Sequence, residues 1–187
     1  MIAVLTTLKV LTLLITLACL VMIAFRYFAL RQGDCDFRLL TAKKTPFRVE
    51  KMDQATAILS ATVPIRNVGR QGGTIMDCFA RPYLPREQYD AAKLRAVVYD
   101  VNRVREDDYW EALIVYAGDD VKLTVKLTLS ATTGNILRDL ETFPDMPIDI
   151  IFQTVGRSDW EYRKGRIYLE AEELRSALYE HVSGGRA

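Results

Sequence analysis

Histidine and cysteine are scarce in this sequence of 187 residues, which contains one histidine and three cysteines. Metal sites and disulfide frameworks are built from clusters of these residues, so we expect no metal ion, no cofactor and no disulfide scaffold. An excess of positive charge is also missing, because 25 lysines and arginines face 24 acidic residues, whereas domains that bind nucleic acid usually carry a basic stripe. The length allows one domain with an appendage and argues against a multidomain enzyme.

Catalytic sequence motifs are absent as well. The sequence has no P-loop, no HExxH zinc motif, no dinucleotide-binding glycine motif and no serine nucleophile elbow. Gly69, Gly72 and Gly73 lack the Lys and Ser/Thr that hold phosphate and metal, so they predict a hairpin loop. His181 lies near the end of a predicted helix, where the helix dipole favours a cation, so we interpret it as a structural residue and not as a catalytic one. The sequence therefore predicts a protein that is not an enzyme.

Charged side chains are missing from most of the N-terminal segment, where Lys9 is the only one before Arg26. A bilayer core is spanned by about 20 apolar residues, and residues 2–25 supply them if Lys9 snorkels toward the headgroups. The aromatic and basic residues that typically flank a membrane helix follow directly: Phe25, Arg26, Tyr27, Phe28 and Arg31. We therefore predict a single transmembrane helix that contacts membrane lipid through residues 2–25.

Three alternatives remain for this segment. A cleaved signal peptide needs a short apolar region and a small-x-small cleavage site, whereas this segment continues as an apolar run to Phe25. A lipoprotein signal at Cys19 is disfavoured because Thr16 stands where that pattern has Leu. A buried core helix is disfavoured because core helices seldom stay apolar around their whole circumference for so long.

Two features of the sequence predict opposite orientations of the chain in the membrane. Basic residues follow the span, and by the positive-inside rule they would place the C-terminal domain in the cytoplasm. They are Arg26, Arg31, Arg38, Lys43 and Lys44. Domains of the type predicted below commonly fill extracytoplasmic modules, and large domains are translocated despite their charges. We predict a single-pass protein of the cell membrane with an extracytoplasmic domain.

Apolar residues alternate with polar ones in the rest of the chain, which predicts β-strands. Residues 32–46 have mixed charge without such periodicity and are predicted as a linker. The predicted strands are 57–65, 74–80, 94–101, 110–116, 121–129 and 148–155. Gly118 to Asp120 are predicted to join residues 110–116 to the next strand as a hairpin, and residues 132–135 supply a second turn. A meander is therefore expected from about Tyr109 to Leu140.

Short strands without βαβ alternation predict a mainly β fold, an antiparallel immunoglobulin-like β-sandwich over residues 47–170. Residues 171–187 are predicted as a short C-terminal amphipathic helix and tail that pack on the sandwich. One face of that helix carries Ala171, Leu174, Ala177, Leu178 and Val182. Residues 1–31 form the transmembrane helix and its flanks.

The run from Val63 to Asp77, a strand ending in Asn-x-Gly followed by a second strand, resembles the opening hairpin of bacterial membrane-anchored immunoglobulin-like or fibronectin-type modules. The resemblance covers about twenty residues. The Cys-Trp-Cys pattern of true immunoglobulin domains is absent. The resemblance implies adhesion, scaffolding or ligand capture, and it carries over no catalytic residue.

Acidic residues gather at three places: Asp34 with Asp36, Glu106 to Asp108, and Asp119 with Asp120. None of these groups has the spacing of a calcium loop, so we interpret them as solvated turn residues. Cys35 and Cys78 are predicted to be separate free thiols.

Two connections, residues 81–90 and 102–110, combine arginine with tyrosine or tryptophan, the residue types that dominate binding hot spots. Both are long, and long loops on a rigid scaffold often carry function. The candidate partner-binding residues are Arg81, Tyr83, Arg86, Tyr89, Arg103, Arg105, Tyr109 and Trp110. In the alternative interpretation, Tyr83, Leu84 and Tyr89 cap the open end of the sandwich.

These features predict a membrane-anchored, non-catalytic binding or scaffolding module of the cell envelope. Its partner would be a protein or another envelope component and no nucleic acid. One alternative is an envelope hydrolase whose carboxylates converge from sandwich loops. Another is a cytoplasmic-facing regulatory partner of a membrane protein.

Overall fold

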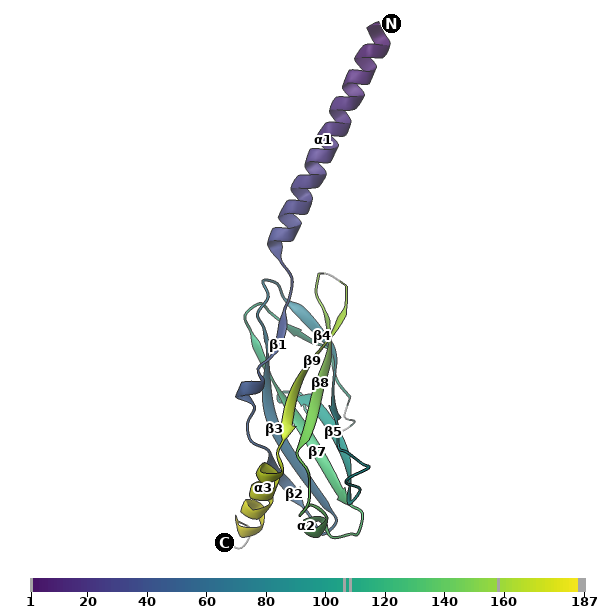
Figure 1. The fold of residues 1–187 in the computed structure, drawn as a ribbon. Helices are drawn as coiled ribbons and strands as arrows, with labels where there is room; N and C mark the ends of the chain where they lie inside the picture. The colour runs from purple at the N-terminus through teal and green to yellow at the C-terminus, as the bar shows by residue number, and fades with distance from the viewer. Residues whose placement is uncertain (1, 106, 108, 158, 185–187) are drawn as a thin grey trace.

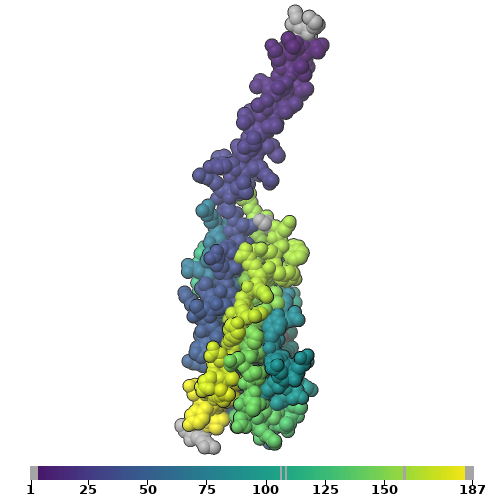
Figure 2. All heavy atoms as spheres, in the orientation of Figure 1, coloured from purple at the N-terminus to yellow at the C-terminus, as the bar shows by residue number. Residues whose placement is uncertain are grey.

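The computed structural model describes residues 2–105, 107, 109–157 and 159–184. Helix α1 (Ile2–Gln32) projects from one end of a β domain, and helix α3 (Ala171–Gly184) lies at the opposite end (Figure 1). The space-filling view shows the same projection, and none of the most apolar part of α1 is buried (Figure 2). The helix is long and apolar enough to cross a membrane, a property that signal sequences near an N-terminus share.

The β domain contains two antiparallel sheets. Sheet A has the order β1-β3-β7-β5, with β2 also paired to β3. Its strands are β1 (Phe37–Leu39), β2 (Arg48–Met52), β3 (Thr56–Asn67), β5 (Ala92–Asp100) and β7 (Asp120–Ala131). Sheet B has the order β6-β4-β8-β9. Its strands are β4 (Gly73–Pro82), β6 (Leu113–Val115), β8 (Met146–Val155) and β9 (Glu161–Leu169). The chain is thus mainly β, with an apolar N-terminal helix and a short C-terminal helix.

A single hydrophobic core takes the inward residues of both sheets. The predicted alternation is confirmed on β3 and over most of β7, whose inward residues are buried: Ala57, Leu59, Ala61, Val63, Ile65, Leu123, Val125, Leu127 and Leu129. On β7 the predicted inward Val121 is only half-buried, and Thr124 on the opposite side is also buried. Sheet B contributes Met146, Ile148, Ile150 and Phe152 from β8. Each fully buried Leu, Ile or Phe side chain stabilises the fold by about 1.5–3 kcal/mol of transfer free energy.

The predicted meander from about Tyr109 to Leu140 is wrong. Strand β6 pairs with β4 in sheet B, whereas β7 pairs with β3 and β5 in sheet A, so residues 116–119 cross between sheets and form no hairpin. Asn67 holds this crossing through backbone hydrogen bonds to Gly118 (2.9 Å) and Asp119 (3.0 Å). Beyond β7 the chain forms the short helix α2 (Ile136–Asp139), which Asn135 caps through its side chain.

The prediction of a linker over residues 32–46 is also wrong. This segment contains β1 and the 3-10 helix η1 (Thr41–Lys43), and Phe37 is buried in the core. Between β1 and β2 the backbone N–H of Leu40 donates to the carbonyl of Pro64 on β3 (2.8 Å). The N–H and the carbonyl of a strand residue point toward the same neighbouring strand. The nitrogen of Pro64 therefore points, like its carbonyl, to the gap between β1 and β2, where the missing N–H removes no hydrogen bond between strands.

A hydrogen-bonded junction joins the β domain to the end of α1, and Asn67 is its centre. The Asn67 side chain is fully buried and donates to the carbonyls of Gln71 (2.8 Å) and Val115 (3.1 Å). Its Oδ1 accepts from the backbone N–H groups of Asp36 (3.1 Å) and Gly69 (3.0 Å). One side chain therefore connects the segment after α1 with the β3–β4 connection and β6.

Helix α3 forms where the sequence predicts it. Leu174, Ala177 and Leu178 are buried, and the helix packs beside β2. The Asp145 carboxylate accepts a hydrogen bond from the N–H of Ala171 at the first turn (2.7 Å), where a negative charge is favoured by the helix dipole.

Candidate partner-binding face

Exposed large apolar side chains distinguish the two sheets. Among the described strand residues they all belong to sheet B and are 42–63% exposed: Met76, Phe79, Ile114, Tyr162 and Tyr168. The outer side of sheet A mostly presents polar and basic side chains, such as Ser60, Thr62, Lys126 and Thr128, and its apolar residues Ile58, Val97 and Tyr99 are half-buried. Among the described strands, sheet B therefore has the exposed aromatic and apolar side chains that are typical of binding sites.

The strand register collects these side chains on one surface. Phe79 on β4 pairs with Ile151 on β8, which pairs with Lys164 on β9. Two residues along, Arg81 pairs with Asp149, which pairs with Arg166. We call this outward surface the sheet B face: Met76, Asp77, Phe79, Arg81, Tyr83, Ile114, Asp149, Ile151, Tyr162, Lys164, Arg166 and Tyr168.

The Asp149 carboxylate anchors the middle of the sheet B face. It is covered by basic side chains and 1% exposed, and it accepts hydrogen bonds from Arg166 Nε (2.6 Å), Arg166 Nη2 (3.1 Å) and Lys164 Nζ (3.4 Å). Hydrogen bonding to Arg166 lowers the pKa of the Asp149 carboxyl to about 2. The guanidinium carbons of Arg81 and Arg166 lie 5.5 and 5.6 Å from the Tyr83 ring centroid. These contacts therefore hold Arg81, Arg166 and Tyr83 in fixed positions on the sheet B face.

Two of the predicted binding residues, Tyr89 and Trp110, are core residues, and their prediction as surface residues is wrong. Tyr89 is 6% exposed, packs edge-on against Phe143 and donates its hydroxyl to the Asp139 carbonyl. Burial raises its pKa to about 12. Trp110 is 7% exposed and donates its indole N–H to the Ile75 carbonyl (3.2 Å). Both rings are large apolar groups whose single polar atom finds a backbone partner inside.

The remaining predicted residues divide between two places. Arg81 and Tyr83 lie on the sheet B face, and Arg86 is exposed in the connection that follows. Arg103, Arg105 and Tyr109 are exposed in the β5–β6 connection.

Arg105 in that connection pairs with Asp107 (2.7 Å) and stacks on Tyr109, and Arg103 lies 3.9 Å from Glu111. Tyr89 anchors the β4–β5 connection near α2, whereas Trp110 anchors the β5–β6 connection near the start of β4. The two connections are therefore two separate surfaces.

The acidic groups of the sequence have other partners. Asp36 binds Arg163 and Arg38, and hydrogen bonding to Arg163 lowers the pKa of the Asp36 carboxyl. Glu106 and Asp108 lie outside the described residues. Within the described part of the chain, no group of three or more His, Cys, Asp or Glu side chains is placed to hold a metal ion. Cys35 and Cys78 are free thiols, as predicted.

Sequence reasoning missed the contributions of β9 and of a bulge in β4. In β9 the outward Tyr162, Lys164, Arg166 and Tyr168 alternate with Gly165, Ile167 and Leu169, a period-two pattern that could have been found. In β4 the register shifts between Ile75 and Asp77, so that Met76 is exposed although it stands two residues from buried Cys78. That bulge breaks the simple alternation and hides the exposed position from sequence.

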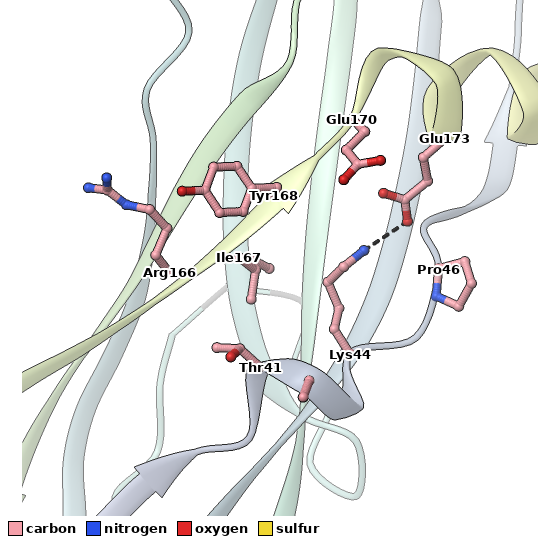
Figure 3. A pocket seen from close by; sticks show the side chains of 9 residues that line it. Thr41, Lys44, Pro46, Arg166, Ile167, Tyr168, Glu170 and Glu173 are labelled. Atoms are coloured by element: carbon pink, nitrogen blue, oxygen red, sulfur yellow. Dashed lines mark hydrogen bonds and ion pairs between the residues drawn. The ribbon is translucent and has the colours of Figure 1, made fainter.

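A groove of about 520 Å³ borders the sheet B face along the free edge of β9 (Figure 3). Arg166 and Tyr168 line it from β9, while Lys44 and Glu173 point toward each other across it and form an ion pair (2.8 Å). The Glu173 carboxylate also accepts the N–H of Phe47 (2.7 Å). This pair ties the start of α3 to the segment before β2 and fixes the width of the groove.

The β9 backbone at Tyr168 turns toward this groove. The Pro147 carbonyl accepts the N–H of Tyr83, the residue after β4, so the backbone polar groups of Pro147 face away from β9. Its opposite residue, Tyr168, therefore directs its N–H and carbonyl to the other side, where no strand of the described chain pairs with β9. The groove thus offers an open strand edge next to exposed aromatic side chains.

Comparisons with known proteins show only distant structural neighbours. No protein-family model matches the chain, and no curated protein is similar to it in sequence. A Bordetella pertussis protein assigned as ApaA is 13% identical, with a TM-score of 0.41 over 73% of this chain and 94% of that chain. The GAE domain of GGA2p from Saccharomyces cerevisiae is 8% identical, with a TM-score of 0.32 over 70% of this chain and 94% of that chain.

Proposed function

We propose that the chain is a single-pass membrane protein of the cell envelope that presents a non-catalytic, immunoglobulin-like sandwich outside the cytoplasm. Helix α1 contacts membrane lipid through residues 2–25. The sheet B face binds a protein partner. One observation carries this proposal: among the described strand residues, the exposed large apolar side chains are confined to sheet B, whereas the apolar side chains on the outer side of sheet A are at most half-exposed.

The immunoglobulin-like part of the proposal is supported by the strand order. Strands β2, β3, β7 and β5 follow the order A-B-E-D of one sheet in that fold, and β4, β8 and β9 follow the order C-F-G of the other. Strand β6 is an addition beside β4. Domains with this architecture are common as binding modules, which is an argument from analogy.

The carboxyl groups with clearly shifted pKa values are poor candidates for the general acid of the hydrolase alternative. A general acid works best with a pKa raised toward the working pH. Among the described residues, the carboxyl pKa values that depart clearly from the usual range are all lowered, by hydrogen bonds to arginine or threonine: Asp36, Asp107, Asp139 and Asp149. These groups are stabilised as anions and would make poor proton donors.

The partner-binding proposal can be tested by photocrosslinking in intact cells. A benzophenone amino acid replaces Phe79 on the sheet B face or, as the matched control, Lys126 on the outer side of sheet A. We expect a discrete crosslinked protein from position 79 and none from position 126. The double variant F79S/Y168S should lose most capture of that protein, whereas T62A/K126S should retain it. Equal crosslinking at both positions would refute the assignment of the face.

The orientation needs a separate experiment. Ser176 is exposed on α3, so the variant S176C offers a thiol for labelling by a membrane-impermeant maleimide. We expect labelling in cells whose outer permeability barrier has been opened while the cytoplasm remains closed. Labelling only after lysis would support the cytoplasmic-facing regulatory alternative.

A further inference from the structure

Four exposed arginines from three separate segments lie around the junction of α1 and the β domain. Arg26 and Arg31 belong to α1, Arg70 to the β3–β4 connection and Arg157 to the β8–β9 connection. Arg157 Nη1 donates to the Ala29 carbonyl (3.2 Å) and to the Gln32 side chain. Arg70 Nη1 donates to the Arg31 carbonyl (3.4 Å). Folding therefore adds two guanidinium groups to the last turns of α1.

The position of these groups along α1 matches the headgroup layer of a bilayer. The apolar run of α1 ends at Phe25. At a rise of about 1.5 Å per residue, Ala29 and Arg31 lie about 6 and 9 Å beyond it along the helix axis. The headgroup layer on each side of the hydrocarbon is about 5–8 Å thick. When α1 spans the membrane upright, the Arg157 guanidinium therefore lies within the headgroup layer and the Arg70 guanidinium lies at its outer boundary.

A cavity of about 380 Å³ lies between Arg26 and Arg157, with Ala29 and Leu30 as its apolar wall. Asp34 is the acidic residue that lines it. Its Oδ1 accepts the backbone N–H groups of Cys35 (2.8 Å) and Arg157 (2.8 Å), which hold the carboxylate against the protein. The cavity thus combines two cationic groups with an apolar wall, as a phosphate group attached to an acyl glycerol requires.

We propose that Arg26, Arg31, Arg70 and Arg157, which we call the arginine collar, attract anionic membrane lipid to the base of the domain, and that Arg26 and Arg157 bind the lipid phosphate in this cavity. The inference rests on the proposed membrane anchor. Each basic residue near an anionic membrane surface increases association by about fivefold. The bound lipid holds the membrane-proximal end of the β domain at the bilayer surface, so that the sheet B face keeps a fixed height above the membrane.

The test uses the full-length protein reconstituted in phosphatidylcholine vesicles that contain phosphatidylglycerol. Spin-labelled phosphatidylglycerol and phosphatidylcholine report the relative association of each lipid with the protein. We expect a clear preference for phosphatidylglycerol that falls at least fivefold in the variant R70Q/R157Q. The variant R138Q/R175Q removes the same charge at the far end of the domain and should keep the preference. The single variant R26Q lies in α1 alone and tests the collar without altering the β domain.

The outcomes separate the anchor from the lipid site. Protein that is extracted from membranes by carbonate would refute the anchor itself. Protein that stays in the membrane without any phosphatidylglycerol preference, or that loses it equally in both double variants, would overturn the arginine collar. Inorganic phosphate should reduce the preference no more than sodium chloride of equal ionic strength. A larger reduction by phosphate would assign the site to the free anion and overturn the lipid.

Discussion

Replacing Asn67 by alanine should destabilise the domain more than any other single asparagine substitution at a described position. The side chain is fully buried, and its two donors and two acceptor bonds serve the backbone of Asp36, Gly69, Gln71 and Val115. A typical hydrogen bond contributes about 1 kcal/mol net, and a buried group left without a partner costs about 1–3 kcal/mol. Because some of these groups lie near the surface and regain water, we expect a total loss of about 3 kcal/mol in the free energy of unfolding.

The assay is denaturant unfolding of the detergent-solubilised full chain, followed by the fluorescence of buried Trp110 in a background that carries W160F. The variant N102A is the matched control, because Asn102 is exposed, and it should change stability by less than about 0.5 kcal/mol. The variant N67D keeps the acceptor but turns a carboxylate toward two carbonyls, so it should be at least as unstable as N67A. A loss below about 1 kcal/mol in N67A would refute the reasoning that this side chain organises the junction.

Three further predictions concern other contacts. A Cβ on Gly156 would clash with Asp34 Oδ1, so G156A should lower the melting temperature of the full chain by several degrees, whereas G72A, whose Cβ would meet only ordinary van der Waals contacts, should cost far less. The Asp149 pKa of about 2 lies below its unfolded value near 3.9, so its ion pair stabilises the fold above about pH 4 and is lost as the pH falls through 2. The stability difference between wild type and D149N, about 1–2 kcal/mol at pH 6, should therefore shrink toward pH 2 in unfolding experiments, and a constant difference would contradict the assigned pairing. Y89F should lose about 1 kcal/mol by the same unfolding assay, because it leaves a buried carbonyl at the end of α2 without its hydroxyl donor.

Local pattern was sufficient for several elements. The apolar run of α1, the alternation in β3 and β7, and the apolar face of α3 are each encoded within one segment, because helix and strand periodicity depend only on neighbouring residues.

The candidate site depended on contacts that no local pattern contains. The sequence marked Arg81 and Tyr83 as binding residues, but it marked Tyr89 and Trp110 for the same reason, and only their burial separates the two pairs. An aromatic residue in a loop has the same signature whether it fills the end of a core or faces solvent.

The sequence by itself determined a long apolar helix, a chain of alternating strands and a terminal amphipathic helix. Tertiary structure alone decided that β6 joins sheet B instead of pairing with β7, that a bulge exposes Met76, and that Arg166 covers Asp149 beside Tyr83. The physical reason is that strand pairing, register shifts and ion pairs form between segments that are far apart in the chain. Alternation shows that a strand has two faces, but the packing of the whole domain selects which face meets the core and which remains open to a partner.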